Sequence, residues 1–367
     1  MAEATPRRAF QTLDGLRGVG AFLVVIRHVP SMFGGLKVPE SFLAVDLFYL
    51  VSGFVVAHAY GERLKGGGFF TAFVKTRIIR LYPLYALGVG IGVISALVSI
   101  FGDPNGWWSW GKLAEALLTG LILFPLSPGI QANGSSLDGP TWTLLPEIIA
   151  NVIYARFIRF MTTPVLLAIV AVSGAGVIFA ELHYQTLDVG YGDTQLWAAL
   201  ARVGFSFFAG VLVFRFFGGR EHRSNWAAWI TVAVLGAALA VSPDDDWVNY
   251  YELALVLVGF PLLLIAAAWF EPGPRSGRLF SLVGLVSYGV YIVHQPLGNL
   301  ARSALTRWPA LVDHSGILSG ALFMAGVVGL SWWLDGHYDA PVRKVLRARF
   351  LKAPAPSSPA AQPRALG

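Results

Sequence analysis

The stretch TPVLLAIVAVSGAGVIFAEL, residues 163–182, decides the fold class of this chain. Its one charged residue, Glu181, lies next to its end. An α-helix needs about 20 consecutive apolar residues to cross the hydrocarbon core of a membrane, and this stretch satisfies that requirement. Ten further apolar stretches occur along the 367 residues, so the sequence predicts an all-α polytopic membrane protein.

The composition excludes a soluble globular protein. Hydrophobic residues make up 55% of the chain and charged residues only 13%, whereas soluble domains carry about 25% charged residues. The net charge of +6 comes from basic residues in short loops, which indicates membrane topology and not a nucleic-acid partner. There is no cysteine, which excludes disulfides, thiolate catalysis and cysteine metal sites.

The loops between the apolar stretches predict which stretches cross the membrane. The eleven stretches cover residues 13–33, 41–60, 80–101, 112–126, 140–160, 163–182, 196–217, 226–242, 250–270, 279–300 and 317–335. Basic residues gather in alternate loops, while the loops at 183–195 and 242–249 carry Asp without Lys or Arg. The positive-inside rule holds along the chain only if one stretch does not cross. The short stretch 112–126 carries Glu115 and ends in the breaker-rich segment FPLSPGIQANGSSLDGP, so we expect it to be re-entrant or interfacial.

Ten transmembrane helices with both termini in the cytoplasm follow from this pattern. We expect a cytoplasmic N-terminal segment at 1–12, a membrane unit at 13–345 and a basic, then disordered, cytoplasmic tail at 346–367. The N-terminus lacks a cleavable signal, so the first helix is expected to remain in the mature protein. In this topology the loop with Arg302 and Arg307 lies on the outer side of the membrane, and it is the one exception to the positive-inside rule.

Ionisable residues inside membrane spans are costly and are therefore functional candidates. Helix rise places His28 and His294 about 22 Å from the inner ends of their spans, and Asp46 and Glu147 about 8–10 Å from the outer ends. Arg202 lies at a comparable depth, so all five share one level. Structural roles stay open: the histidines as satisfied core residues, Glu147 as the counter-ion of Arg202, and Asp46 as a structural carboxylate.

Arg17 and His28 are eleven residues apart, which is about three helical turns, so they share one face about 16 Å apart. Arg17 is predicted near the cytoplasmic mouth with Arg77 and Arg80, where three guanidinium groups can bind a phosphorylated ligand. The phosphopantetheine arm of coenzyme A has about the reach from this mouth to His28. There an imidazole suits the role of general base. Two alternatives to a ligand site stay open: Arg17 only forms an ion pair with Asp14 at a helix mouth, and Lys75, Arg77 and Arg80 only anchor the chain by the positive-inside rule.

Six motifs occur in order along the chain. They are LDGLRGVGAFLVVIRH with Arg17 and His28, VDLFYLVSGFVV with Ser52, RIIRLYPLY with Arg77 and Arg80, WTLLPE with Glu147, SYGVYIVHQPL with Tyr288 and His294, and YDAPVRK with Asp339. Over about residues 10–345 the chain resembles the acyltransferase-3 family, bacterial membrane O-acyltransferases that decorate surface polysaccharides. It departs from the family pattern at Pro146, at Ala150-Asn151, and at Thr143 and Asp339, where the family has Ser and Glu.

The resemblance implies transfer of an acyl group from cytoplasmic acyl-CoA, in the simplest case acetyl-CoA, to a sugar hydroxyl outside a bacterial inner membrane, with no metal. The expected catalytic residues are His28, Glu147, Asp46 and His294, and the expected CoA-binding residues are Arg17, Arg77, Arg80, Ser52 and Tyr288. Direct transfer from the donor and transfer through an acyl-histidine both stay open. Other open possibilities are a lipid-linked or small exported acceptor, a transporter of a charged solute, and a binding or scaffold protein.

Overall fold

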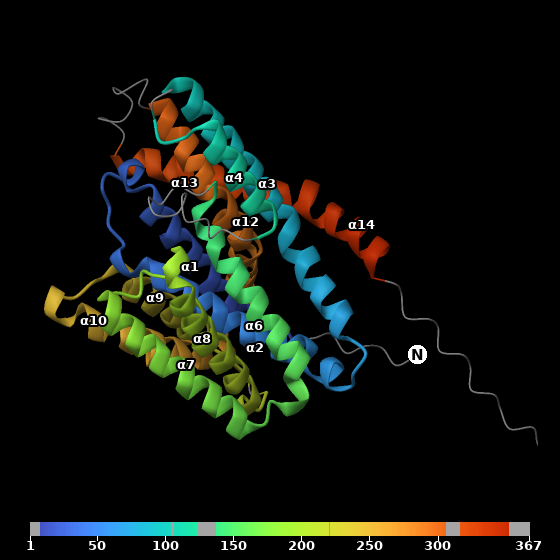
Figure 1. The fold of residues 1–367 in the computed structure, drawn as a ribbon. Helices are drawn as coiled ribbons and strands as arrows, with labels where there is room; N and C mark the ends of the chain where they lie inside the picture. Colours follow the sequence, from blue (N-terminus) through green and yellow to red (C-terminus); the bar gives the residue numbers. More distant parts are fainter. Residues whose placement is uncertain (1–7, 104–105, 124–136, 220, 306–315, 352–367) are drawn as a thin grey trace, which may run out of the picture.

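A computed structural model describes residues 8–103, 106–123, 137–219, 221–305 and 316–351, and these residues form a bundle of α-helices (Figure 1). The helices are α1 (Gln11–His28), α2 (Ala44–Lys65), α3 (Phe70–Gly102), α4 (Trp110–Leu121), α6 (Leu144–Phe157), α7 (Thr163–Tyr184), α8 (Leu196–Phe216), α9 (Asn225–Ala240), α10 (Asp245–Ala254), α11 (Phe260–Trp269), α12 (Pro274–Leu305), α13 (Gly316–Leu334) and α14 (Ala340–Phe350). In the described parts of the chain, the strands are β1 (His222–Arg223) and β2 (Phe270–Glu271), one short parallel pair. The helical class predicted from the sequence is confirmed.

Seven helical stretches among the described residues are long and apolar enough to cross a membrane. They are Pro39–Lys65, Phe70–Gly102, Thr163–Tyr184, Leu196–Phe216, Asp245–Trp269, Pro274–Ala304 and Gly316–Phe350. This confirms a polytopic membrane protein. The count of ten stays a prediction, because α1 carries three charged residues in 18, α6 has 14 residues and α9 has 16.

The stretch expected not to cross contains α4. Its 12 residues extend about 18 Å, which falls short of a hydrocarbon core of about 30 Å. The hydroxyl groups of Tyr82 and Tyr85 on α3 donate to the carbonyl oxygens of Leu121 and Gly120 and hold α4 against α3. Most of the following breaker-rich segment lies outside the described residues, so the re-entrant path stays a prediction.

Two expected loops are helical. α3 begins well before residue 80, so Lys75 and Arg77 lie within a helix. α12 continues past its expected end and includes Arg302, whose Nη2 donates to the carbonyl oxygen of His28 at 3.2 Å. Arg302 therefore satisfies a carbonyl group at the C-terminal end of α1, where a cation is favourable. This contact explains why a basic residue is found on the side of the membrane that we predict to be external. Arg307 is not among the residues that the structure describes.

Glycine allows α2 and α8 to approach closely. A Cβ atom on Gly53 would lie 1.9 Å from the carbonyl oxygen of Phe207, and one on Gly210 would lie 2.0 Å from that of Leu50. Only residues without a side chain fit such a crossing. Gly53 directly follows Ser52, so this contact fixes the part of α2 that brings Ser52 to a cavity.

The β1–β2 pair lies at the start of α1. Oε2 of Glu271 accepts a hydrogen bond from the Gln11 backbone N–H at 3.0 Å, and the carbonyl oxygen of Phe270 accepts one from Thr12 Oγ1 at 2.5 Å. Burial raises the pKa of Glu271 to about 7, compared with about 4.3 for an ordinary glutamate. An acid with a raised folded-state pKa destabilises the fold progressively as the pH rises from its unfolded pKa to its folded pKa.

We therefore expect Glu271→Gln to raise the melting temperature at pH 8 by about 3 °C or more, since glutamine keeps an acceptor for Gln11 without the buried charge. The difference should shrink as the pH falls and disappear below about pH 4, where Glu271 is protonated in both the folded and the unfolded wild type. Thermal unfolding in detergent at both pH values measures this, with the exposed Glu62→Gln as the control. An equal shift at both pH values would show that burial of the charge is not the cause.

Candidate active site

Two adjoining cavities share side chains of α1, α3 and α12 in their walls. We call the first the basic cavity, which five arginines and three aspartates line, and the second the central cavity, which Ser52 and Glu147 line. The side chains that line both cavities are Arg17, Arg77, Arg80 and Tyr288. The central cavity has an empty volume of about 820 Å³, part of which is open to solvent.

A third cavity, the histidine cavity, contains His28 and has an empty volume of about 870 Å³. Val45 and Tyr291 line both this cavity and the central cavity. The three cavities therefore form a row from Arg17, near the start of α1, to His28 at its end.

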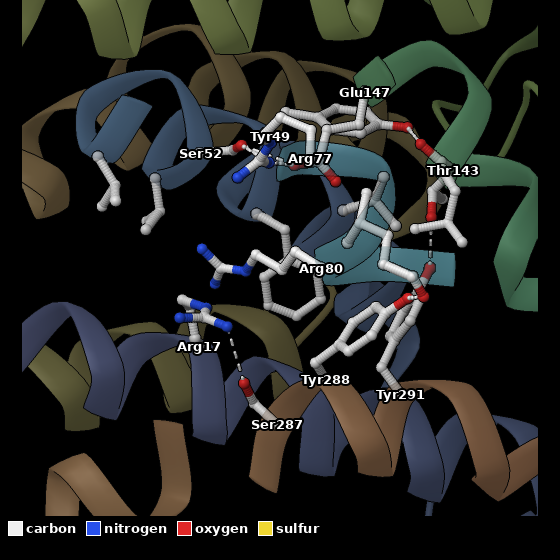
Figure 2. Close-up of a pocket in the computed structure, with 16 residues that line it drawn as sticks. Arg17, Tyr49, Ser52, Arg77, Arg80, Thr143, Glu147, Ser287, Tyr288 and Tyr291 are labelled. Atoms are coloured by element: carbon white, nitrogen blue, oxygen red, sulfur yellow. Dashed lines mark hydrogen bonds and ion pairs between the residues drawn. The ribbon is translucent and has the colours of Figure 1, made fainter. Parts of the chain in front are cut away.

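The arginines of the basic cavity differ in whether they are paired. Nη1 of Arg17 lies 3.5 Å from Oδ1 of Asp14, and Nη2 donates to Oγ of Ser287 at 3.3 Å. The side chain of Arg80 forms no hydrogen bond or ion pair with any residue in the described part of the chain. Figure 2 shows the guanidinium groups of Arg17 and Arg80 close to each other in the same cavity. The Arg17–Asp14 pair expected as an alternative is present, but it leaves Arg17 at the cavity wall.

Arg77 is paired in the central cavity. Its Nη2 lies 2.6 Å from Oε1 of Glu147, and Oγ of Ser52 donates to the same oxygen at 2.7 Å. Nη2 of Arg77 also donates to Oγ of Ser52 at 3.3 Å, so the three side chains form a closed network (Figure 2). Arg77 is thus neutralised, and Arg17 and Arg80 remain as the cations of this group that face the cavities.

The counter-ion of Arg202 is Asp46, so the alternative that Glu147 fills this role is wrong. Nε of Arg202 donates to Oδ1 of Asp46 at 3.2 Å, and Nη2 donates to Oδ2 at 2.5 Å. Nη1 donates to the carbonyl oxygen of Val189 at 2.7 Å. Both side chains are fully buried, and this bidentate pair fixes α2 against α8.

His28 and His294 form a contact pair. Nε2 of His294 lies 3.2 Å from Nδ1 of His28. Each Nδ1 also lies beside the backbone carbonyl oxygen four residues earlier, Val24 at 2.8 Å and Val290 at 3.0 Å. A carbonyl oxygen only accepts hydrogen bonds, so in both neutral rings Nδ1 carries the proton.

This tautomer leaves the lone pair of His28 on Nε2. Among the described residues, Nε2 of His28 has no hydrogen-bond partner, and its ring lines the histidine cavity. A neutral imidazole with a free nitrogen at a cavity can accept a proton from a ligand that binds there. His294 is fully buried and contacts the opposite side of the His28 ring, so its geometry suits orienting that ring. Within the described chain, neither Asp46 nor Glu147 hydrogen-bonds to His28.

The other residues of the histidine cavity were not predicted from the sequence. Trp142, Asp188, Tyr191 and Gln295 line it together with Arg27. Nη2 of Arg27 pairs with Oδ2 of Asp188 at 2.6 Å. Asp188 drew attention only as a loop charge, and Trp142 only as part of WTLLPE, because sequence does not show which loops meet over a helix end.

Two tyrosines of the SYGVYIVHQPL segment face the cavities. Tyr288, predicted to bind CoA, donates its hydroxyl to the carbonyl oxygen of Leu81 at 2.6 Å at the junction of the basic and central cavities. The Tyr291 hydroxyl lies 2.9 Å from the carbonyl oxygen of Pro140 and 3.1 Å from Oγ1 of Thr143. Tyr291 therefore forms part of the wall between the central and histidine cavities.

Comparison with known proteins identifies the family. A family described as an acyltransferase domain matches residues 10–336. The chain belongs to the acyltransferase 3 family. It is 37% identical over 196 residues to "Protein 2 in picA locus" of Rhizobium radiobacter, covering 50% of this chain and all of that protein. It is 25% identical over 342 residues to "Putative membrane-bound transacylase BcsY" of Komagataeibacter xylinus, covering 89% of this chain and 81% of that protein. No solved structure matches this acyltransferase 3 protein.

Proposed function

We propose that this membrane acyltransferase transfers an acyl group, acetyl in the simplest case, from acyl-CoA to a hydroxyl group of a sugar or polysaccharide. The donor enters the basic cavity and the acceptor enters the histidine cavity. The observation that carries this proposal is the row of three cavities that links unpaired Arg80 to the free nitrogen of His28.

The donor end suits a phosphorylated carrier. Arg80 lacks a carboxylate partner among the described residues, and a buried or half-buried unpaired guanidinium is costly unless an anion binds it. Arg17 lies beside it, and arginine recognises phosphate oxygens with two parallel hydrogen bonds. With the diphosphate there, the pantetheine arm extends through the central cavity. Helix rise between Arg17 and His28, about 16 Å, is a distance that this arm can span.

In the reaction that we propose, Nε2 of His28 takes the proton of the acceptor hydroxyl. The hydroxyl oxygen attacks the thioester carbonyl carbon, a C–O bond forms and the C–S bond breaks. The CoA thiolate then takes the proton from the His28 imidazolium, so the products are an ester and free CoA thiol. An acyl group carried briefly on His28 would give the same products in two steps.

The other predicted catalytic residues have supporting roles in this proposal. His294 holds the His28 ring through its Nε2 atom. Glu147 keeps Arg77 and Ser52 in place at the path of the donor arm. Asp46 holds Arg202, which lines the histidine cavity.

The histidine cavity, which we assign to the acceptor, is lined by both aromatic and polar side chains. Trp142 and Tyr191 offer apolar ring faces, and Arg27, Asp188 and Gln295 offer donors and acceptors. A sugar has both an apolar ring face and several hydroxyl groups, so this combination favours a carbohydrate. We further propose a bacterial inner membrane location, ten spans and cytoplasmic termini, because the positive-inside rule then places the basic cavity in the cytoplasm.

Arg80→Ala tests the donor half of this proposal. We expect it to weaken binding of acetyl-CoA by about 10-fold to 100-fold, since a charged hydrogen bond contributes about 1.5–3 kcal/mol. Equilibrium binding of radiolabelled acetyl-CoA to purified protein measures this. Lys75→Ala is the matched control, because Lys75 is an exposed cation on the same helix. A wild type without affinity for acetyl-CoA, or an Arg80→Ala protein with full affinity, would contradict the proposal.

A further inference from the structure

The C-terminal helical stretch contributes side chains to the basic cavity. α13 continues into α14 through a π-helical turn at Asp335–Asp339. Asp335, Asp339 and Arg343 line the basic cavity from this turn and the helix after it. π turns are uncommon and often occur at functional sites, because they change which side chains face inward.

Arg343 is held firmly at this position. Its Nη2 lies 3.1 Å from Oδ1 of Asp335 and 3.1 Å from Oδ2 of Asp339. The other oxygen of Asp339, Oδ1, is buried and has no hydrogen-bond partner among the described residues. Arg343 is therefore neutralised, and the pair of aspartates fixes the direction of the following turn of α14.

Arg347 lies four residues further along α14, on the same face as Arg343. Its side chain lines the basic cavity, is exposed to solvent, and forms no hydrogen bond or ion pair with any residue that the structure describes. Arg349 is two residues further, on the other side of the helix, and does not line the cavity. Thus α14 directs one unpaired arginine into the basic cavity.

The positions of the unpaired arginines follow the chemical order of coenzyme A. Arg80 lines both the basic and the central cavity, whereas Arg347 lines only the basic cavity. In CoA the pantetheine arm is followed by the diphosphate and then by the ribose with its 3′-phosphate. If the diphosphate lies at Arg80, the 3′-phosphate lies on the side away from the arm.

We propose that Arg347 binds the 3′-phosphate of the CoA donor and makes this acyltransferase selective for CoA over carriers that lack this phosphate. This rests on the proposed function, because it assumes that acyl-CoA occupies the basic cavity. Asp335, Asp339 and Arg343 position the helix turn that carries Arg347.

Binding of CoA and of 3′-dephospho-CoA to purified full-length protein tests this. We expect the wild type to bind CoA at least 10-fold more tightly than 3′-dephospho-CoA. Arg347→Ala should lose about 10-fold in affinity for CoA and keep the wild-type affinity for 3′-dephospho-CoA, so that the preference disappears. Arg349→Ala, a matched arginine on the opposite face, should keep the preference.

Three outcomes would overturn this proposal. An Arg347→Ala protein that keeps the CoA preference, or that loses affinity for both ligands equally, would show that Arg347 does not contact the 3′-phosphate.

The phosphate that Arg347 binds could also belong to a lipid headgroup, so the assay is repeated in nanodiscs of neutral lipid and of neutral lipid with phosphatidylglycerol. An effect of Arg347→Ala confined to the anionic nanodiscs would assign the residue to lipid. A wild type that binds neither CoA compound would instead contradict the proposed function itself.

Discussion

Replacing His28 with alanine is expected to lower the rate of acyl transfer by at least about 100-fold, while leaving the affinity for acetyl-CoA within about twofold of wild type. The loss is large because the variant removes the only group that we assign to proton transfer, and general-base catalysis contributes about 10²–10⁴-fold. Binding is retained because the phosphate groups of the donor lie at Arg17 and Arg80, about three helical turns from His28.

Release of the CoA thiol measures this rate. The chain contains no cysteine, so a thiol reagent such as DTNB reports free CoA without a background from the protein. His183→Ala is the control, since His183 is an exposed histidine on α7 that lines none of the three cavities. Normal transfer by His28→Ala would exclude both the general-base and the acyl-histidine mechanism.

Replacing Arg202 with alanine is expected to destabilise the protein by about 3–5 kcal/mol, because it leaves the Asp46 carboxylate buried without a counter-ion. The two side chains are 1% and 0% exposed, so the remaining carboxylate is held away from bulk solvent. The variant also removes the hydrogen bond to the carbonyl oxygen of Val189 in the segment that leads to the histidine cavity. We therefore expect a large fall in the melting temperature together with a loss of activity.

A double variant separates charge burial from packing. Asp46→Leu with Arg202→Met removes both charges and keeps apolar volume, so it should recover much of the stability that Arg202→Ala loses. Thermal unfolding in detergent measures both proteins. Arg223→Ala is the control, since its ion pair with Glu221 is exposed and should contribute about 1 kcal/mol or less. If Arg202→Ala is as stable as Arg223→Ala, the buried pair does not hold α2 to α8.

The placement of Arg17 and His28 could be predicted from the sequence because helix geometry alone relates them. Eleven residues give three turns and a fixed rise, whatever surrounds the helix. The membrane class was predictable for a similar reason, since it depends on the length and polarity of single stretches. The stretch that contains α4 could be predicted not to cross the membrane, because the signs of the loop charges limit which stretches can cross it.

Contacts between helices could not be predicted in this way. Whether Glu147 pairs with Arg77 or with Arg202 depends on how far each helix is rotated and shifted relative to its neighbours. The contact of His28 with His294 joins residues at similar predicted depth, but depth alone does not show that two rings meet. The π turn before α14 leaves no clear sequence signal, so Arg347 was assigned to a basic tail and not to the cavity.

The central claim is that this acyltransferase needs His28 to transfer an acyl group from cytoplasmic acyl-CoA to a hydroxyl group on the other side of the membrane. The most direct test asks on which side of the membrane each product forms. Inverted inner-membrane vesicles that contain the wild type or His28→Ala receive acetyl-CoA labelled in the acetyl group, which reaches only the cytoplasmic face. We predict that the wild type deposits label inside the vesicles as an alkali-labile ester and releases CoA thiol outside, and that His28→Ala does neither. Equal amounts of ester in the two preparations, or label that enters without release of CoA thiol, would contradict the account.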